Sequence, residues 1–275
     1  RCKRTKRGEQ YCGMYLQCIA VYDRIRNGSL RNRNRLTERI TDEVKGTLYG
    51  VGVGPGDPRL MTCLAVETIE KCPVIAVPAE GREHAVSYRI AAGMVKNLDE
   101  KLCLNLSTPM TKNRRVLEQN YETAADRIAE QLEEGRDVAY LTLGDPTIYS
   151  TYIYIHRIIR KRGYETGIIN GIPSFCAVAA KLGDSLADRS QQLHIIPSTY
   201  DIEEALTYPG SKVLMKAASK LPDVKAALQE KGLAGIMVEN CGLSDERIYD
   251  NIDDMPEKAS YYTIVVVKEN GYPIS

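Results

Sequence analysis

A chain of 275 residues, 43% of them hydrophobic, is long enough for one large domain or two of ordinary size. It contains no run of about 18 apolar residues and no apolar signal-peptide segment, so we expect a cytoplasmic protein with no membrane partner. The eight cysteines include no Cys-x-x-Cys pair, which argues against a zinc ribbon or a disulfide framework.

The net charge of +1 conceals a basic N-terminal region. Residues 1–40 carry 11 basic and 3 acidic residues, whereas the rest of the chain carries 26 basic and 33 acidic residues. A basic arm of this kind is typical of some nucleic-acid-binding proteins. Residues 1–45 show neither a helical nor a strand period, however, and we interpret them as an extension outside the fold, with no nucleic-acid partner.

Short apolar strands alternate with helices between residues 46 and 170. The predicted strands cover residues 47–53, 74–77, 102–106, 138–143 and 166–169, and the predicted helices cover residues 59–71, 87–95, 120–134 and 148–162. Asp57 and Pro58 are expected to begin the first helix, and Gly135 and Gly163 are expected to end two later ones. This alternation favours a parallel sheet with helices on both faces.

The pattern changes after residue 170. We expect helices at residues 173–182 and 221–231 and strands at residues 193–196, 212–215, 236–239 and 261–267. The last strand is rich in aromatic and β-branched residues. The sequence therefore predicts an α/β fold of two domains, a parallel-sheet domain over residues 46–170 and a mixed-sheet domain over residues 171–275.

Two predicted strands run into loops that close on the same tripeptide, Gly-Asp-Pro. They span residues 48–58, Leu-Tyr-Gly-Val-Gly-Val-Gly-Pro-Gly-Asp-Pro, and residues 141–151, Leu-Thr-Leu-Gly-Asp-Pro-Thr-Ile-Tyr-Ser-Thr. The first is not a dinucleotide fingerprint, because Pro55 interrupts the Gly-x-Gly-x-x-Gly spacing. Its glycines are expected to let backbone approach a ligand closely, although an ordinary strand-to-helix turn is the alternative.

The second loop follows a strand at the end where open α/β sheets bind ligands. Gly144 removes a side chain from the path of a ligand. Asp145 is expected either to accept a hydrogen bond from that ligand or to cap a helix that begins at Pro146. We favour a ligand-lining role with a capping component.

Together with Gly171-Ile-Pro-Ser-Phe175, these loops resemble the tetrapyrrole methylases, which use S-adenosylmethionine to methylate precursors of sirohaem and vitamin B12. Residues 141–152 and Pro109-Met-Thr-Lys112 are similar to the branch that methylates C20 of precorrin-2 or its cobalt form. The resemblance covers residues 46–270 and implies two α/β domains, with the active site in the cleft between them. It also implies a homodimer.

The resemblance implies a set of residues for each ligand. The residues implied to bind S-adenosylmethionine are Pro55, Gly144, Asp145, Ile148, Ser150, Thr151, Pro173, Ser174, Met215 and Asn240. Those implied to bind the tetrapyrrole are Lys112, Arg114, Arg115 and Tyr149, with Arg82 and Arg89 as further candidates. Basic side chains would hold the carboxylates of the macrocycle by charge-assisted hydrogen bonds, although each alone could also belong to a solvated face.

No catalytic residue or metal ligand is assigned. The three histidines have no metal-ligand spacing, and His156 is more readily interpreted as a structural side chain than as a proton acceptor. Two alternatives to C20 methylation remain open. One is another tetrapyrrole methylase, acting on uroporphyrinogen III or a later precorrin. The other is a non-catalytic nucleotide- or RNA-binding module.

Overall fold

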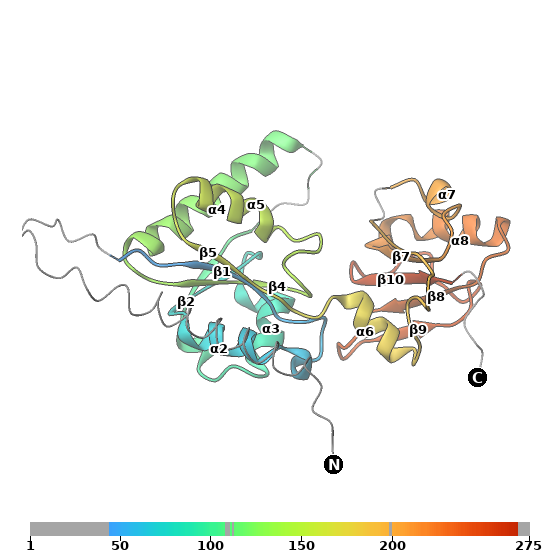
Figure 1. Ribbon diagram of the computed structural model, residues 1–275, viewed down its shortest axis with the longest axis horizontal. Coiled ribbons are helices and arrows are strands. Elements are labelled where there is room, and N and C mark those ends of the chain that lie inside the picture. Colours follow the sequence, from blue (N-terminus) through green and yellow to red (C-terminus); the bar gives the residue numbers. More distant parts are fainter. Residues whose placement is uncertain (1–43, 108–110, 112, 198–199, 269–275) are drawn as a thin grey trace, which may run out of the picture. The chain divides into compact units, whose positions relative to one another are not determined.

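The first half of the chain builds a parallel five-stranded sheet (Figure 1). The computed structural model describes residues 44–107, 111, 113–197 and 200–268. The strands are β1 (Leu48–Gly52), β2 (Val74–Val77), β3 (Leu102–Asn105), β4 (Val138–Thr142) and β5 (Thr166–Ile169). Their order is β3-β2-β4-β1-β5, and every neighbouring pair is parallel. All five predicted strands are confirmed, with ends that differ by at most one residue.

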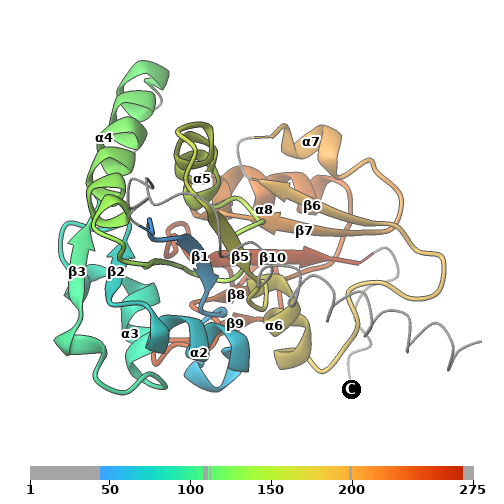
Figure 2. The same cartoon turned by 60° about the vertical axis from the view of Figure 1, so that its left-hand side comes forward.

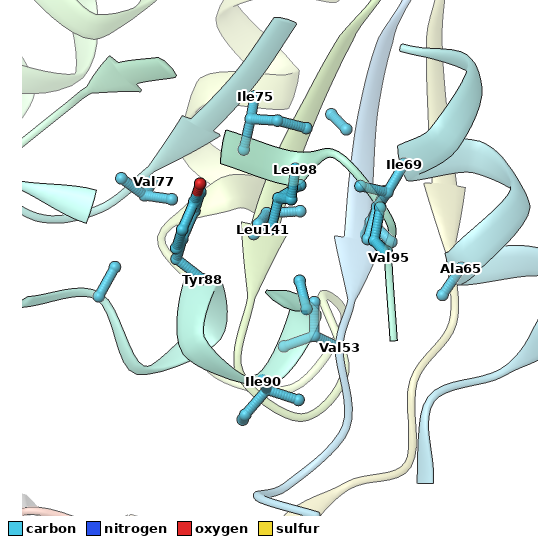
Figure 3. Close-up of a cluster of buried hydrophobic side chains, with 14 of the residues drawn as sticks. Val53, Ala65, Ile69, Ile75, Val77, Tyr88, Ile90, Val95, Leu98 and Leu141 are labelled. Atoms are coloured by element: carbon cyan, nitrogen blue, oxygen red, sulfur yellow. The ribbon is translucent and has the colours of Figure 1, made fainter. Parts of the chain in front are cut away.

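Helices cover both faces of this sheet (Figure 2). The helices are α2 (Cys63–Lys71), α3 (Val86–Ala92), α4 (Arg114–Glu133) and α5 (Tyr152–Lys161), with short 3-10 turns η1 (Pro58–Leu60), η2 (Arg82–His84) and η3 (Leu98–Glu100). Ala139 and Leu141 of β4 pack into the cluster under α2 and α3, which Figure 3 shows. Val138 and Tyr140 pack into the cluster under α4 and α5. Because both faces of the central strands β2 and β4 are buried, these two strands are apolar at nearly every position.

Three predicted helices begin elsewhere than expected. The helix predicted at 120–134 begins earlier, at Arg114, because Asn113 caps α4 by accepting hydrogen bonds from the amides two and three residues further along the chain. The helix predicted at 59–71 is divided, because Asp57 caps only the short turn η1 and Thr62 caps α2 by accepting a hydrogen bond from Ala65. The helix predicted at 148–162 begins only at Tyr152. The residues before it form turns, and Tyr149 has a left-handed backbone with φ of 48°, which interrupts a helix.

The second half of the chain builds a mixed five-stranded sheet. Its strands are β6 (Leu193–Pro197), β7 (Ser211–Met215), β8 (Gly235–Glu239), β9 (Arg247–Tyr249) and β10 (Thr263–Val267), in the order β6-β7-β10-β8-β9. Only β6 and β7 pair in parallel. The helices are α6 (Ser174–Lys181), α7 (Ile202–Ala205) and α8 (Leu221–Glu230), with a 3-10 turn η4 (Ala217–Lys220). The predicted mixed sheet is confirmed, while the short elements α7 and β9 were not predicted.

The two sheets are connected between Ile169, the end of β5, and Ser174, the start of α6. The predicted domain boundary falls in this connection, and the division into domains at residue 170 stays a prediction. In the described part of the chain, no helix combines the length and apolar character needed to cross a bilayer.

A chain trimmed to begin at Val44 is expected to unfold at the same denaturant midpoint as the full chain. Among the described residues, the contacts that anchor the start of β1 come from residues after Val44. Gly46 N donates to the Leu132 carbonyl over 2.8 Å, and Thr47 N donates to the Asp137 carboxylate over 2.7 Å. Urea denaturation of both chains, monitored by circular dichroism, is the measurement.

A second trimmed chain beginning at Leu48 is the control. It loses both anchoring hydrogen bonds and is expected to unfold at a lower midpoint, since each bond contributes roughly 0.5–3 kcal/mol. A lower midpoint already in the chain that begins at Val44 would show that the fold includes residues before it.

Candidate functional site

A cavity of about 480 Å³ lies at the carboxyl end of β4. The ends of β7 and β8, the start of β10 and the first residue of α6 complete its wall. Eight of the ten predicted cofactor residues line it, namely Pro55, Gly144, Ile148, Ser150, Thr151, Ser174, Met215 and Asn240. Tyr149, predicted to bind the substrate, lines it as well. Segments that are far apart in the sequence therefore meet at this one cavity.

The glycine-rich loop before Asp57 serves close packing of backbones. A Cβ atom at Gly52 would lie 2.6 Å from the carbonyl oxygen of Gly144 and 2.6 Å from the amide nitrogen of Gly171. A Cβ atom at Gly56 would lie 2.4 Å from the Cys241 carbonyl oxygen. These two glycines are therefore required by contacts between backbone segments of the protein, and the expectation that the loop approaches a ligand closely stays a prediction.

Asp145 joins the loop after β4 to the segment after β5. Its Oδ1 accepts hydrogen bonds from the amide of Thr147 at 2.7 Å and from the hydroxyl of Thr147 at 2.5 Å. Its Oδ2 accepts from the Asn170 side chain and from the Gly171 amide, both at 3.0 Å. Burial raises the pKa of Asp145, but the hydrogen bonds outweigh it and hold the pKa below its ordinary value.

The predicted helix cap at Asp145 is wrong, because no helix begins at Pro146. Asp145 is only 6% exposed and does not line the cavity, and Pro173 does not line it either. The structure thus places Asp145 behind the cavity wall, and its role in binding a cofactor stays a prediction.

The loop before α5 brings hydroxyl groups to the cavity. Ser150 is buried, and its Oγ lies 3.3 Å from Oγ1 of Thr142 and accepts a hydrogen bond from the Tyr152 amide at 3.1 Å. The hydroxyl of Tyr149 donates to the Ile195 carbonyl of β6 at 3.1 Å. This last bond fastens the loop to the mixed sheet.

Asn240 follows β8 with a left-handed backbone, φ 52°, and is buried. Its amide nitrogen Nδ2 donates to Asp245 over 2.7 Å, and its Oδ1 accepts from the hydroxyl of Ser260 over 2.6 Å. The side chain of Asn240 therefore stabilises the turn that forms this part of the cavity wall.

Several residues of the cavity were not predicted from the sequence. Tyr140, Thr142, Tyr261 and Tyr262 all line it. The two C-terminal tyrosines were assigned to a strand, but β10 begins only after them at Thr263. Lys216 also lines the cavity. It ends the segment Leu214-Met215-Lys216, which the resemblance implies closes the adenosine pocket, but of this segment only Met215 was predicted to contact the cofactor.

The predicted basic residues lie elsewhere. Arg114 and Arg115 begin α4, both are exposed, and neither lines the cavity. Nε of Arg114 donates to Glu118 over 2.8 Å. Arg82 pairs with Asp99. Arg82 and Arg89 do not line the cavity either, and Lys112 lies outside the described residues. The contribution of these residues to substrate binding stays a prediction.

No described residue set provides a metal site, since no three His, Cys, Asp or Glu side chains of the described ranges gather closely enough to hold an ion. Nδ1 of His156 lies 3.1 Å from the Tyr152 hydroxyl, which donates to the Gly167 carbonyl. Burial, aided by two neighbouring arginines, lowers the pKa of His156. His156 does not line the cavity.

The sequence matches the family described as Tetrapyrrole (Corrin/Porphyrin) Methylases over residues 47–256. The probable cobalt-precorrin-2 C(20)-methyltransferase of Methanocaldococcus jannaschii is 30% identical over 80% of this chain and 95% of the relative. The cobalt-precorrin-2 C(20)-methyltransferase of Salmonella typhimurium is 29% identical over 82% of this chain and 98% of the relative.

Solved structures share the fold. The cobalt precorrin-4 methyltransferase structure has a TM-score of 0.65 at 17% identity and covers 81% of this chain and 94% of its own. A uroporphyrin-III C-methyltransferase from Thermus thermophilus, complexed with S-adenyl homocysteine, has a TM-score of 0.60 at 17% identity over 82% of this chain and 98% of its own. The combination of a parallel and a mixed sheet is thus an architecture that these enzymes also have.

Proposed function

We propose, from the fact that this chain belongs to the tetrapyrrole methylases, that it transfers the methyl group of S-adenosylmethionine to C20 of precorrin-2 or its cobalt form. The reaction is a step of cobalamin biosynthesis. The choice of C20 rests on two relatives named as C(20)-methyltransferases, which this chain matches over nearly their whole length. Residues 141–152 and 109–112 support the same choice by their resemblance to the C20 branch.

The cavity fits S-adenosylmethionine in size and position. Its volume of about 480 Å³ falls within the usual range for small-molecule sites. It lies at the carboxyl end of a central strand of the parallel sheet, where α/β proteins bind ligands. We propose that Met215 and Asn240 contact the adenosine, and that Gly144, Ser150 and Thr151 contact the remainder of the cofactor.

S-adenosylmethionine would supply a methyl group on a sulfonium, from which the neutral thioether S-adenosylhomocysteine leaves readily. The residues of this chain then have to bind both reactants, orient them and exclude water. Holding two reactants in line can contribute about 7–11 kcal/mol to lowering a barrier. The two tyrosines before β10 and the loop before α5 both line the cavity, and we propose that they contribute to this positioning. We assign no side chain to removal of the proton.

The position of the transferred methyl group tests the proposal. The full chain is incubated anaerobically with precorrin-2, with and without cobalt, and with S-adenosylmethionine that carries a ¹³C-labelled methyl group. We expect a single new label at C20, located by carbon NMR. Label at a pyrrole β-carbon would identify a different tetrapyrrole methylase, and no transfer to either substrate would contradict the proposal.

Three accompanying expectations are proposed with this function. The enzyme is expected to be a homodimer, to act in the cytoplasm and to have no nucleic-acid partner. Faster turnover of the cobalt form would assign the enzyme to the oxygen-independent route, which we favour.

A further inference from the structure

Lys216 is the one charged residue among the described residues that line the cavity. It follows β7 directly and is half-buried. Its ammonium lies 3.5 Å from the Tyr149 carbonyl oxygen and 5.6 Å from the centre of the Tyr261 ring. Neither neighbour carries a negative charge. None of the ion pairs of the described chain includes Lys216.

The backbone of Lys216 is held in a conformation that lysine rarely adopts. Its φ is 57°, in the left-handed region. Two other cavity residues share this conformation, Tyr149 with φ 48° and Asn240 with φ 52°. Asparagine tolerates the left-handed region because its short polar side chain can hydrogen-bond to nearby backbone. Lysine has no such local hydrogen bond to offset the steric cost. Strained backbone conformations cluster at functional sites, so the conformation of Lys216 favours a functional role for its side chain.

We propose that Lys216 binds a carboxylate of a ligand in this cavity. The inference rests on the proposed function and deepens it. An ammonium has three donors, and the Tyr149 carbonyl accepts from it only at the long distance of 3.5 Å. The Tyr261 ring lies within reach of a cation–π contact that orients the side chain.

Two ligands of the proposed reaction carry the required group. S-adenosylmethionine has one carboxylate at its methionine end, and the tetrapyrrole has acetate and propionate side chains. Both offer the same chemistry to Lys216, a charge-assisted hydrogen bond between ammonium and carboxylate. The source of the carboxylate is therefore a question for the experiment.

The test compares Lys216→Met with wild type and with Lys231→Met, a matched change at an exposed lysine directly after α8. Three probes are titrated into the full chain, with affinity followed by calorimetry or by porphyrin fluorescence. S-adenosylhomocysteine carries the methionine carboxylate, methylthioadenosine lacks it, and uroporphyrin III carries the carboxylates of a macrocycle. We expect Lys216→Met to weaken one carboxylate probe by about 10- to 100-fold. Methylthioadenosine should bind to Lys216→Met as tightly as to wild type. The control Lys231→Met should bind all three probes with wild-type affinity.

The outcome identifies the carboxylate. Weaker binding of S-adenosylhomocysteine alone assigns Lys216 to the cofactor, and weaker binding of uroporphyrin alone assigns it to the macrocycle. If Lys216→Met binds both carboxylate probes with wild-type affinity, or if it loses as much affinity for methylthioadenosine as for S-adenosylhomocysteine, the proposal for Lys216 is overturned. The proposed function is left intact by either result. Failure of the wild-type protein to bind either carboxylate probe would overturn both.

Lys216→Asn separates ligand binding from folding. Asparagine suits the left-handed backbone, so this variant should unfold at a higher temperature than wild type while it loses the same affinity as Lys216→Met. Retained affinity in Lys216→Asn would show that the ammonium makes no contact with a ligand carboxylate.

Discussion

Replacement of Asp145 by alanine is expected to lower the free energy of unfolding by roughly 3–5 kcal/mol. The carboxylate is buried and accepts four hydrogen bonds, two from Thr147 and two from the segment at Asn170 and Gly171. Alanine leaves these donors without their acceptor and separates the loop after β4 from the segment after β5. Urea denaturation of the variant and of wild type measures the difference.

Asp57→Ala is the matched control, because Asp57 belongs to the other Gly-Asp-Pro tripeptide. Its carboxylate accepts only from Arg59, whose side chain is 85% exposed, and caps a turn of three residues. We expect little change in stability, since exposed ion pairs contribute little. Equal losses in the two variants would contradict the structural role that we assign to Asp145.

The contribution of Asp145 should depend on pH in a definite direction. The folded protein holds the pKa of Asp145 below its ordinary value. Its stabilisation is therefore complete above the unfolded pKa of about 3.9 and is lost as the pH falls toward the folded pKa. The difference in unfolding free energy between wild type and Asp145→Asn should consequently shrink below about pH 4. A difference that grows as the pH falls would contradict the assignment.

Gly144→Val is expected to weaken binding of S-adenosylhomocysteine by roughly 100-fold or more, through added bulk and a strained backbone. Gly144 lines the cavity, and its φ of 71° lies in the region that a β-branched residue avoids. A Cβ atom at Gly144 would not clash, since its nearest neighbours, Ile172 O and Ser174 N, lie at 3.8 Å. The two methyl groups of valine would extend further, into space near the start of α6. Calorimetry with S-adenosylhomocysteine is the measurement.

Gly163→Val distinguishes the effect of a strained backbone from the effect of a side chain that fills the cavity. Gly163 follows α5 with φ of 88°, and a Cβ atom there would meet nothing within 4 Å. Valine at Gly163 should therefore lower stability while S-adenosylhomocysteine binds as in wild type. Gly144→Asn adds a side chain that tolerates the left-handed backbone, and it should lose affinity with little loss of stability. Normal affinity in both Gly144 variants would place the cofactor elsewhere.

The strands and the fold class were predictable because the signal for them is local. A strand buried on both faces must be apolar at nearly every position, as residues 74–77 and 138–142 are. The short elements α7 and β9 give no such signal. β9 has three residues, none of them buried, so its pairing with β8 stabilises it rather than its own pattern. Helix starts were harder to predict, since Thr62 and Asp57 both qualify as caps.

Most of the predicted cofactor residues line one cavity, because their segments end strands whose carboxyl ends meet there. Sequence could not distinguish the two Gly-Asp-Pro tripeptides, which differ only in what lies beside them. One aspartate meets the backbone of Gly171, 26 residues away, whereas the other meets a neighbouring arginine. Tyr261 and Tyr262 likewise became cavity residues only in the folded chain. Strand formation follows from the residues of each segment, but which backbones and side chains touch is decided by packing between segments far apart in the chain.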